Sequence, residues 1–299
     1  MGKRRNLVVV ADDFGIGPET SRGILELAAE RRITATVLLT NSPYAADAVA
    51  GWNRAGRPIE LGWHPNLTLN PPVLPAAEVP SLVDASGCFH PLSAFLSRAC
   101  TGRLRAAEIA AELRAQYERF IELVGRPPTL VNSHQHVALF GPVGGTLLEL
   151  LHDQVPKPFV RRVREPAAML WRIPGAKMKR AVLSYRGARL ARQSERLGFP
   201  GCEVLCGITD PACTADEAFY SRWLRLVPGE TVELACHPGY RDETLIGRDV
   251  ETDGAGVMRR VHELHLLRAP SFAAACHAAG LRLLAPGELL HAASESRAA

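Results

Sequence analysis

The architecture of this chain follows from Leu7-Val8-Val9-Val10-Ala11-Asp12-Asp13-Phe14-Gly15. Five apolar residues in a row predict a short buried strand, over 6–11, whose last positions deliver Asp12 and Asp13 to one edge of a sheet. Adjacent strand residues point to opposite faces, but both carboxylates can turn toward one site where the strand gives way to a loop. An aspartate that ends a strand more commonly caps the following turn or helix. The interpretation of the pair as a site therefore depends on histidine-bearing segments downstream.

Apolar runs alternate with helical patterns along the chain. Helices are predicted over 18–31, from residue 43 onward and over 106–124, where apolar residues recur at helical spacing. Further strands are predicted at 34–40, 59–63, 129–133, 158–163, 203–206, 231–236 and 281–284. This alternation indicates an α/β fold with a parallel sheet, and about seven or eight strands over this length predict a distorted (β/α) barrel in a single domain, 1–299. The proline-rich stretch 65–91 is predicted to be a long loop or lid.

Composition argues against several classes of function. The chain has 299 residues and is 47% hydrophobic, so a large core can form, and no stretch approaches the roughly eighteen apolar residues that span a bilayer. The apolar run after Lys3-Arg4-Arg5 ends too soon, in Asp12-Asp13, to be a signal peptide. The seven cysteines are scattered and odd in number, which favours reduced thiols in a cytoplasmic protein. A formal charge of +4 is too small to indicate nucleic-acid binding.

The positive charge is concentrated in one segment, 157–192. Between Lys157 and Arg192 there are eleven Lys or Arg residues and one acid, Glu165. The part over 177–192 has the pattern of a basic helix with apolar residues among the charges, and such a helix can lie on an anionic membrane. A solvated helix face is the more common explanation of this pattern. Both interpretations stay open, and the first predicts a protein that works peripherally at the inner face of the membrane.

Four chemical clusters follow predicted strands. They are Asp12-Asp13, Gly62-Trp63-His64, Ser133-His134-Gln135-His136 and Cys236-His237-Pro238-Gly239-Tyr240. The carboxyl ends of parallel strands lie at one edge of the sheet, where the active sites of α/β folds assemble. A single histidine after a strand is usually an ordinary polar residue, but histidine or aspartate after several strands of one sheet indicates a site.

These clusters predict metal-assisted hydrolysis of an acyl bond. Asp13, His64 and His134 offer one carboxylate and two imidazoles, and three protein ligands leave room for water and substrate around a divalent cation. Such a cation acidifies water and polarises a carbonyl. Asp12 is then free to act as general base, and His237, from another strand, can protonate the leaving group as general acid.

The donor set does not fix the metal. One carboxylate and two imidazoles accept zinc or magnesium, and also manganese, cobalt or nickel. His136 lies two residues beyond His134 and competes with it for the cation; we assign His134 to the metal and His136 to substrate contact. One of three arginines is expected to orient Asp12 or to bind substrate, without a pattern that chooses among them. They are Arg161, Arg162 and Arg164.

In these motifs the chain resembles the YdjC-like carbohydrate deacetylases, which include chitooligosaccharide deacetylases. The resemblance covers about residues 6–290 in family order. It rests on Ala11-Asp12-Asp13-Phe14-Gly15, Gly62-x-His64, Phe120-Ile121-Glu122-Leu123-x-Gly125-Arg126-x-Pro128, Ser133-His134-Gln135-His136-Val137 and Glu233-Leu234-x-Cys236-His237-Pro238. It implies a distorted (β/α) barrel that removes N-acetyl groups from amino sugars with a divalent metal, and it implies a homodimer. It also implies Asp13, His64 and His134 as metal ligands, Asp12 as base and His237 as acid.

Departures from the family pattern bear on the substrate. Asn132 stands where chitooligosaccharide-type members tend to have Asp, and Asn66 follows His64 at the start of the proline-rich loop. The expected substrate contacts are His136, Arg161, Arg164 and Asn66. A subgroup of the family is associated with hopanoid biosynthesis and acts on an N-acetylglucosaminyl lipid. The basic 177–192 segment and the 65–91 loop suit such a lipid-linked substrate.

Three other functions stay open at this point. The first is a plain chitooligosaccharide (diacetylchitobiose) deacetylase. The second is a metal-dependent phosphoesterase, which should show a glycine-rich phosphate cradle or a second metal cluster; the sequence shows neither. The third is a non-catalytic sugar- or lipid-binding protein, which would have no need of Asp12 and His237.

Overall fold

A sheet of eight strands forms the centre of the computed structural model, which describes residues 5–250 and 254–289. The strands are β1 (Arg5–Phe14), β2 (Ala35–Leu38), β3 (Glu60–Trp63), β4 (Leu130–Val131), β5 (Phe159–Val160), β6 (Val204–Cys206), β7 (Thr231–Cys236) and β8 (Leu281–Leu283). Their order is β5-β4-β3-β2-β1-β7-β6, with β8 beside the start of β1. The pairings are parallel, as the alternation of strands and helices predicts.

Backbone hydrogen bonds join the two ends of the sheet. The Val160 N–H donates to the Pro200 carbonyl (2.8 Å), and the Leu205 N–H donates to the Arg164 carbonyl (2.9 Å). The chain at and after β5 therefore lies against the chain around β6, and the sheet curls on itself. The predicted fold class, an α/β distorted barrel of parallel strands in a single domain, is confirmed.

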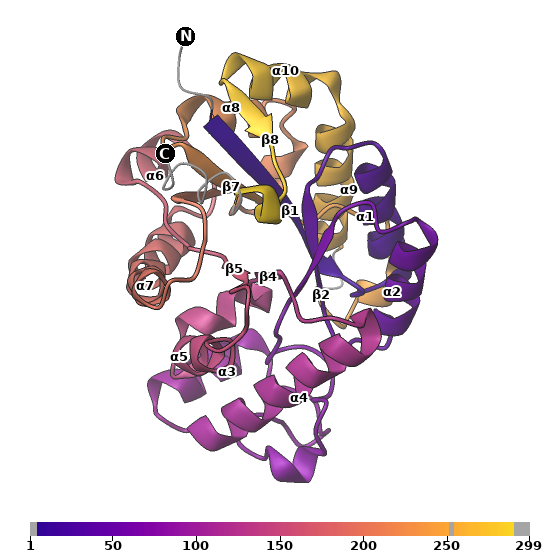
Figure 1. The fold of residues 1–299 in the computed structure, drawn as a ribbon, viewed down its shortest axis with the longest axis vertical. Helices are drawn as coiled ribbons and strands as arrows, with labels where there is room; N and C mark the ends of the chain where they lie inside the picture. The colour runs from indigo at the N-terminus through magenta and orange to yellow at the C-terminus, as the bar shows by residue number, and fades with distance from the viewer. Residues whose placement is uncertain (1–4, 251–253, 290–299) are drawn as a thin grey trace.

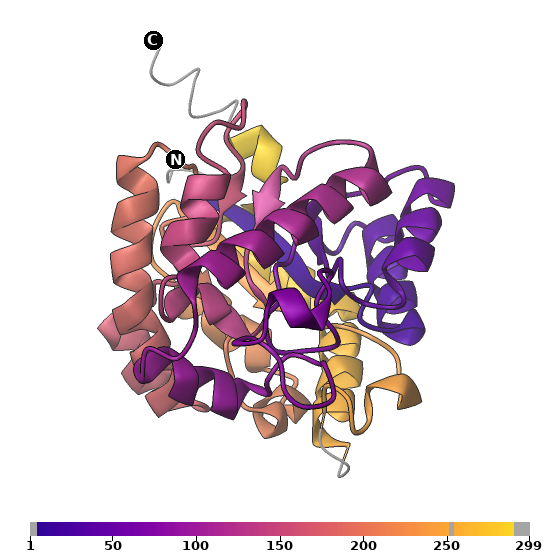
Figure 2. The same ribbon diagram turned by 90° about the horizontal axis from the view of Figure 1, so that it is seen from below.

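Helices surround this sheet (Figures 1 and 2). They are α1 (Pro18–Ala29), α2 (Ala45–Arg54), α3 (Leu92–Cys100), α4 (Ala106–Val124), α5 (Val143–Leu150), α6 (Ala167–Arg172), α7 (Lys177–Arg196), α8 (Phe219–Leu226), α9 (Ala255–Arg268) and α10 (Pro270–Ala278). Four short 3₁₀ helices are η1 (Ala76–Glu78), η2 (His134–Leu139), η3 (Pro211–Ala215) and η4 (Glu243–Leu245). In Figure 1, α1, α2 and α9 lie on one side of β1 and α7 on the other. Among the described residues, every helix is too short or too polar to traverse a bilayer.

Strand β1 lies at the centre of the core. Its residues 7–11 have no exposed surface, and it pairs with β7 along one edge and with β2 and β8 along the other. A parallel strand covered on both faces is a continuous apolar run rather than an alternating one, which explains the opening sequence. Each fully buried Val or Leu side chain contributes roughly 1.5–3 kcal/mol, so this strand is a firm support for the two aspartates at its end.

The predicted loop over 65–91 is irregular apart from η1, and it packs against α4. Two buried carboxylates of α4 hold its backbone. Glu112 accepts from the N–H groups of Val73 and Leu74 (2.9 and 3.1 Å), and Glu108 accepts from that of Ser81 (2.6 Å). The loop is described in full, and it contributes no residue to the lining of the pocket reported below. The loop is therefore packed against α4, and its predicted role as a lid stays a prediction.

Candidate active site

Asp12 and Asp13 lie just before the end of β1, and both line the same cavity. The pairing of β1 with β2 is irregular between Ala11 and Phe14, and Asp13 has a left-handed backbone conformation with φ of 66°, which aspartate tolerates better than most residues. This irregularity breaks the alternation of strand side chains. Both carboxylates are buried. As expected, both turn toward one site, because a bulge near the end of the strand changes the direction of their side chains.

Asp13 meets two histidines that follow neighbouring strands. His64 comes directly after β3, and His134 opens η2 after β4. Asp13 Oδ1 lies 2.9 Å from His134 Nδ1 and 3.2 Å from His64 Nε2. One ligand atom from each of the three residues lies within 4.8 Å of the others, and all three side chains are buried. The structure therefore brings the predicted metal ligands together.

Asn132 sets the orientation of His64. Its Nδ2 donates to Asp12 Oδ1 (2.9 Å), since a carboxylate only accepts, and its Oδ1 therefore faces His64 Nδ1. The proton of neutral His64 is then assigned to Nδ1, and Nε2 presents its lone pair to Asp13 Oδ1. Two acceptor atoms at this distance repel each other unless a cation binds both, so the residues present fit a metal ion.

Removing the Asn132 amide should therefore weaken metal binding. Asn132→Leu keeps the approximate size but cannot accept the Nδ1–H of His64, and we expect a loss of about 10- to 100-fold in metal affinity, the usual effect of removing a partner that orients a ligating histidine. Competition with a chelating dye measures it. Asn53→Leu, an exposed position on α2, is the control. Equal affinity in both variants would show that Asn132 does not orient His64.

Negative charge is in excess around the same histidines. Arg260 of α9 donates to Asp13 Oδ2 (2.7 Å) and to Asp249 Oδ2 (2.9 Å), so one guanidinium serves two carboxylates. His134 Nε2 lies 3.5 Å from Asp249 Oδ1. Burial alone would lower the pKa of His134, but Asp13 and Asp249 outweigh it and raise that pKa to about 10. The cluster favours one more positive charge, which a divalent cation would supply.

Arg161 holds Asp12 in its ionised form. Its two Nη atoms donate to the two oxygens of Asp12 (2.6 and 2.9 Å), and its Nε donates to the buried Glu233 of β7 (2.5 Å). Burial alone would raise the pKa of Asp12, but the charge and hydrogen bonds of Arg161 lower it well below the usual range. Of the three candidate arginines, Arg161 is the one that orients Asp12, whereas Arg162 donates to two backbone carbonyls before β6.

Three of the four residues expected to contact substrate do not line the pocket, and the first of them, Arg161, binds Asp12 instead. Arg164 pairs with Glu195 of α7 (2.7 Å). Asn66 is fully buried; its side chain donates to the Leu69 carbonyl (2.6 Å) and accepts from the Thr68 N–H (2.9 Å). Both follow strands of the sheet, as the site residues do, but their polar groups are satisfied locally by an ion pair and by a side-chain-to-backbone turn.

His237 reaches the pocket from the end of β7. Its Nε2 lies 3.9 Å from Asp12 Oδ2, and Arg259 of α9 donates to its Nδ1 (3.1 Å). Because Nδ1 accepts, the proton of the neutral imidazole is on Nε2, the atom nearer Asp12. Glu263 accepts from Arg259 (2.7 Å) and from the His237 N–H (2.5 Å). Burial and the charge of Arg259 lower the pKa of His237 to about 4, so the imidazole is neutral near pH 7.

A cavity of about 200 Å³ connects these groups. It is smaller than the roughly 300–1,000 Å³ of sites for drug-sized ligands, so it suits one small group of a substrate. His136 lines it, as predicted, together with Lys179 from α7. Gln135 and His136 have φ of 49° and 57°, and strained backbone of this kind concentrates at functional sites.

Several residues of the site received no role from the sequence. They are Asn132, Glu233, Asp249, Arg259 and Arg260. Glu233 had a visible signal, because a carboxylate inside an apolar strand needs a buried partner. In the sequence, Asn132 stands out only as a departure from a family pattern. The arginine pair on α9 and Asp249 are ordinary for a helix face and a loop, and no pattern in the sequence distinguishes them.

Comparisons with known proteins place the chain in a family and match its fold. The model of the family described as YdjC-like protein matches residues 6–278. A carbohydrate deacetylase of Mus musculus is 32% identical over 304 residues, which cover 96% of this chain and 95% of the relative. A chitooligosaccharide deacetylase of Klebsiella pneumoniae (strain 342) is 30% identical over 283 residues, 93% of this chain and 97% of the relative. A crystal structure from Enterococcus faecalis V583 has the same fold, with a TM-score of 0.71 and 24% identity over 96% of this chain and 99% of that one.

Proposed function

This chain belongs to the YdjC-like family, and from that premise we propose that it is a metal-dependent hydrolase that removes the N-acetyl group from an N-acetylglucosamine-containing substrate. One observation carries the proposal. A single buried pocket holds three metal-ligand side chains, Asp13, His64 and His134, beside two groups suited to proton transfer, Asp12 and His237. The relatives named as carbohydrate and chitooligosaccharide deacetylases favour an acetylated sugar as the substrate.

Asp13, His64 and His134 would hold the metal. When bound, a divalent cation acidifies a water molecule and polarises the acetamide carbonyl. The donor set suits magnesium or zinc, and manganese, cobalt or nickel are the alternatives. Asn132 orients one of the two imidazoles and Asp249 faces the other, so both ligands are positioned before a cation arrives.

Asp12 takes the proton of the attacking water. Its carboxylate is ionised at working pH, and hydrogen bonds from Arg161 and Asn132 fix both of its oxygens. As the water oxygen forms a bond to the acetyl carbon, one O–H proton passes to Asp12. A base held in place by three hydrogen bonds does not have to be oriented during the reaction, which lowers the entropic part of the barrier.

His237 then protonates the departing amine, the C–N bond breaks and acetate leaves. The histidine must begin this step as an imidazolium, so that Nε2 gives up a proton and a neutral ring remains. Asp12 Oδ2, 3.9 Å away, can return the water's proton to the same atom for the next turnover. Arg259 opposes the imidazolium by its charge and by its hydrogen bond to Nδ1.

Because Arg259 disfavours the imidazolium form of His237, it should affect how activity depends on pH. The acid form of His237 is lost as pH rises through its pKa, so activity should fall on the alkaline limb of the kcat/KM profile. Arg259→Met removes the neighbouring charge and should move that limb upward, by at most about 2.5 pH units, since a free imidazole has a pKa near 6.5. His237→Ala should abolish the limb. An unmoved limb in Arg259→Met, or a limb that survives in His237→Ala, contradicts the assignment.

We further propose that the sugar is carried on a lipid of the hopanoid type, and that the protein works in the cytoplasm, peripherally at the inner face of the membrane, as a homodimer. The basic helix α7 supports this proposal, because its first part lies beside the pocket through Lys179. A soluble chitooligosaccharide is the alternative substrate.

Acetate release tests the proposal. Metal-reconstituted protein is given N,N'-diacetylchitobiose and an N-acetylglucosaminyl lipid in micelles, side by side. Turnover of either that disappears with a chelator and in Asp12→Asn supports the deacetylase, and the preferred substrate decides between soluble sugar and glycolipid. No acetate from either by metal-loaded protein overturns it. Phosphate release from a phosphate ester would then indicate a phosphoesterase, and sugar binding without turnover a binding protein.

A further inference from the structure

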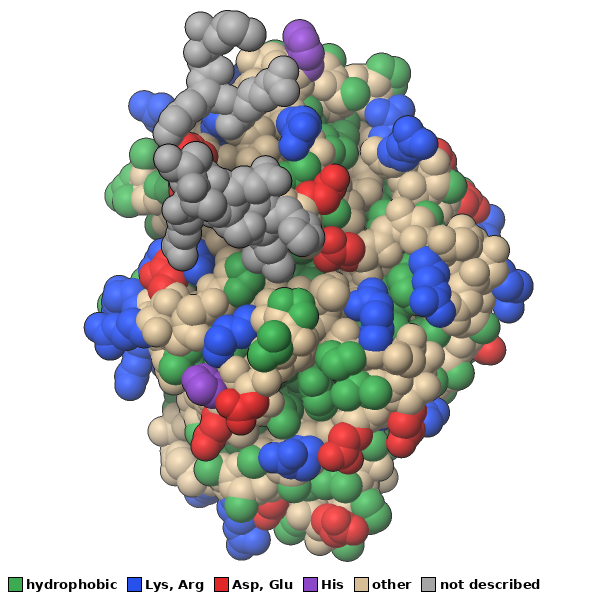
Figure 3. Space-filling model, viewed as in Figure 1, with side chains coloured by type: hydrophobic (Ala, Val, Ile, Leu, Met, Phe, Trp, Pro, Cys, Tyr) green, Lys and Arg blue, Asp and Glu red, His purple; other side chains and the backbone are tan. Residues whose placement is uncertain are grey.

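The outer face of α7 carries a line of exposed apolar residues that continues into a row of arginines. Met178, Val182 and Tyr185, the apolar stripe, are 82%, 45% and 85% exposed. Arg189 and Arg192 follow at the same spacing of three or four residues, so all five share one helix face. Lys and Arg side chains gather over α7 at the left edge of the molecule (Figure 3). Large apolar side chains grouped on a surface mark an interaction site.

The apolar stripe begins beside the catalytic pocket. Lys179, the neighbour of Met178, lines that pocket. Trp171, at the end of α6, is 80% exposed, and its carbonyl accepts from Lys177 Nζ (3.3 Å), which places it at the start of α7. A surface that covered the stripe would therefore lie next to the pocket as well.

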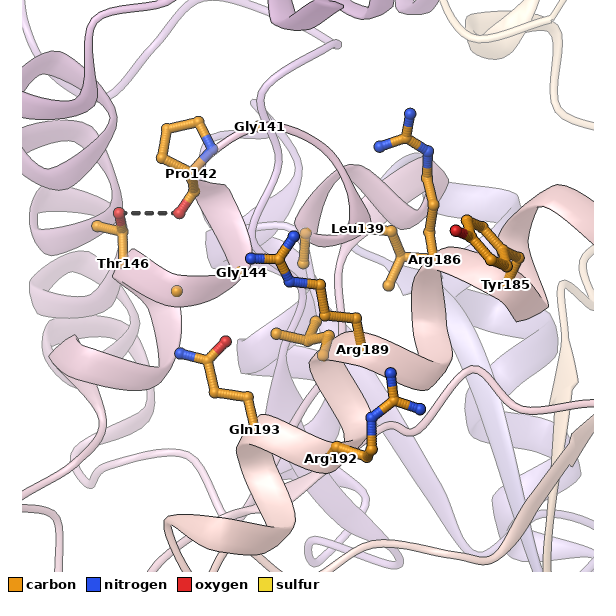
Figure 4. Close-up of a pocket in the computed structure, with 13 residues that line it drawn as sticks. Leu139, Gly141, Pro142, Gly144, Thr146, Tyr185, Arg186, Arg189, Arg192 and Gln193 are labelled. Atoms are coloured by element: carbon orange, nitrogen blue, oxygen red, sulfur yellow. Dashed lines mark hydrogen bonds between the residues drawn. The ribbon is translucent and has the colours of Figure 1, made fainter.

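Three arginines line a second cavity, of about 680 Å³, between α7 and the start of α5. We call it the arginine pocket, after Arg186, Arg189 and Arg192. In Figure 4, Arg189 reaches toward Gly144 of α5 and the other two flank it. No acidic residue lines this cavity. Within residues 5–250 and 254–289, none of the three guanidinium groups has a carboxylate at ion-pair distance.

Three other arginines of the basic segment, Arg161, Arg164 and Arg180, pair with carboxylates. Arg161 pairs with two carboxylates of the catalytic site, Arg164 with Glu195, and the buried Arg180 with Glu165. Like charges one turn apart on a helix repel each other, so the row in the arginine pocket opposes folding unless an anion binds there. The three arginines of the arginine pocket therefore keep their charge unneutralised among the described residues, and this cavity lies next to the apolar stripe.

We propose that this face of α7 docks on an anionic membrane, with the apolar stripe in the interfacial layer and a phospholipid headgroup phosphate in the arginine pocket. Basic amphipathic helices lie in the interface in this way, and the guanidinium group binds phosphate through two parallel hydrogen bonds. A second copy of the chain is a poorer occupant, because a two-fold contact would set the basic row against itself or against the apolar stripe. The biological role of this docking rests on the proposed function: it would bring the catalytic pocket to a lipid-linked sugar.

Vesicle sedimentation tests the docking. Wild-type protein should bind vesicles that contain phosphatidylglycerol and not vesicles of phosphatidylcholine alone. R186Q/R189Q/R192Q should bind the anionic vesicles about 100-fold more weakly, from about 1 kcal/mol for each basic residue near the surface. M178S/Y185S should also weaken binding, without a change of charge. The control R54Q/R103Q/R114Q removes the same charge from exposed positions elsewhere, and its binding should stay within about threefold of wild type.

Several outcomes would overturn the docking. An equal loss of vesicle affinity in the control variant would show that only the net charge of the protein matters. Equal binding to phosphatidylcholine vesicles would show that the arginines of the arginine pocket do not select anionic lipid. Displacement by millimolar inorganic phosphate would indicate a site for soluble phosphate. A vesicle-free dimer that dissociates in M178S/Y185S would assign the face to a second copy.

Acetate release from soluble diacetylchitobiose, measured without vesicles, tests the proposed function independently of the docking. The α7 variants should keep wild-type release, since none of the substituted residues lies in the catalytic pocket. If wild-type protein released no acetate, the proposed function would fail, and the vesicle result would still decide the docking.

Discussion

Replacing Asp12 by asparagine is expected to lower kcat for acetate release by about 10²- to 10⁴-fold, the range that a positioned general base contributes. Asparagine has nearly the same shape and can still accept from Arg161, but its amide cannot take the proton of water. Arg161 keeps Glu233 as a partner, so the buried guanidinium is not left unpaired. Metal content after dialysis, measured by elemental analysis, should equal that of wild type, because Asp13 is unchanged.

Glu233→Gln is the matched control for Asp12→Asn. It also removes one buried carboxylate bound to Arg161, but this carboxylate does not line the pocket. We expect it to keep kcat within about tenfold of wild type, since a positioning partner contributes less than the base itself. If both variants lost activity equally, the charge balance of Arg161, and not proton transfer to Asp12, would explain the loss.

The sequence was enough to predict that the three proposed ligands lie together, because of one geometric rule. In a parallel sheet the carboxyl ends of strands share an edge, so Asp13, His64 and His134 had to come close once their strands were recognised. The same rule also selected Asn66 and Arg164, which do not line the pocket. It places a residue at the edge but does not say whether its polar group is already satisfied by a turn or an ion pair.

The supporting groups could not be predicted, because they depend on contacts between segments that are far apart in sequence. Asn132 meets Asp12, Arg161 joins Asp12 of β1 to Glu233 of β7, and Arg260 crosses from α9 to Asp13. Local patterns fix periodicity and turns, whereas these contacts depend on how far each side chain reaches across the barrel. Strand lengths show the same limit. The strand predicted over 129–133 is only Leu130–Val131, because the polar residues after it leave the sheet for the site.

Asp13→Asn should give the opposite metal result from Asp12→Asn, although the two substitutions are chemically identical and adjacent. Asp13 Oδ1 is the atom on which both imidazoles converge, so its loss should weaken metal binding by more than the roughly 100-fold upper range for an orienting partner. Acetate release should then be undetectable at micromolar metal and should recover in part at millimolar metal, which Asp12→Asn should not do.

The pair of variants tests the division of labour between the two carboxylates directly. Each loses activity, so activity alone cannot separate them; metal content and rescue by excess metal can. Asp12 is bound on both oxygens by Arg161 and on one by Asn132, which leaves it little freedom to ligate a cation, whereas Asp13 shares one oxygen with two imidazoles. If Asp13→Asn kept its metal and Asp12→Asn lost it, the roles would be exchanged, and the bulge that turns both side chains to one cavity would have to present them in the reverse order.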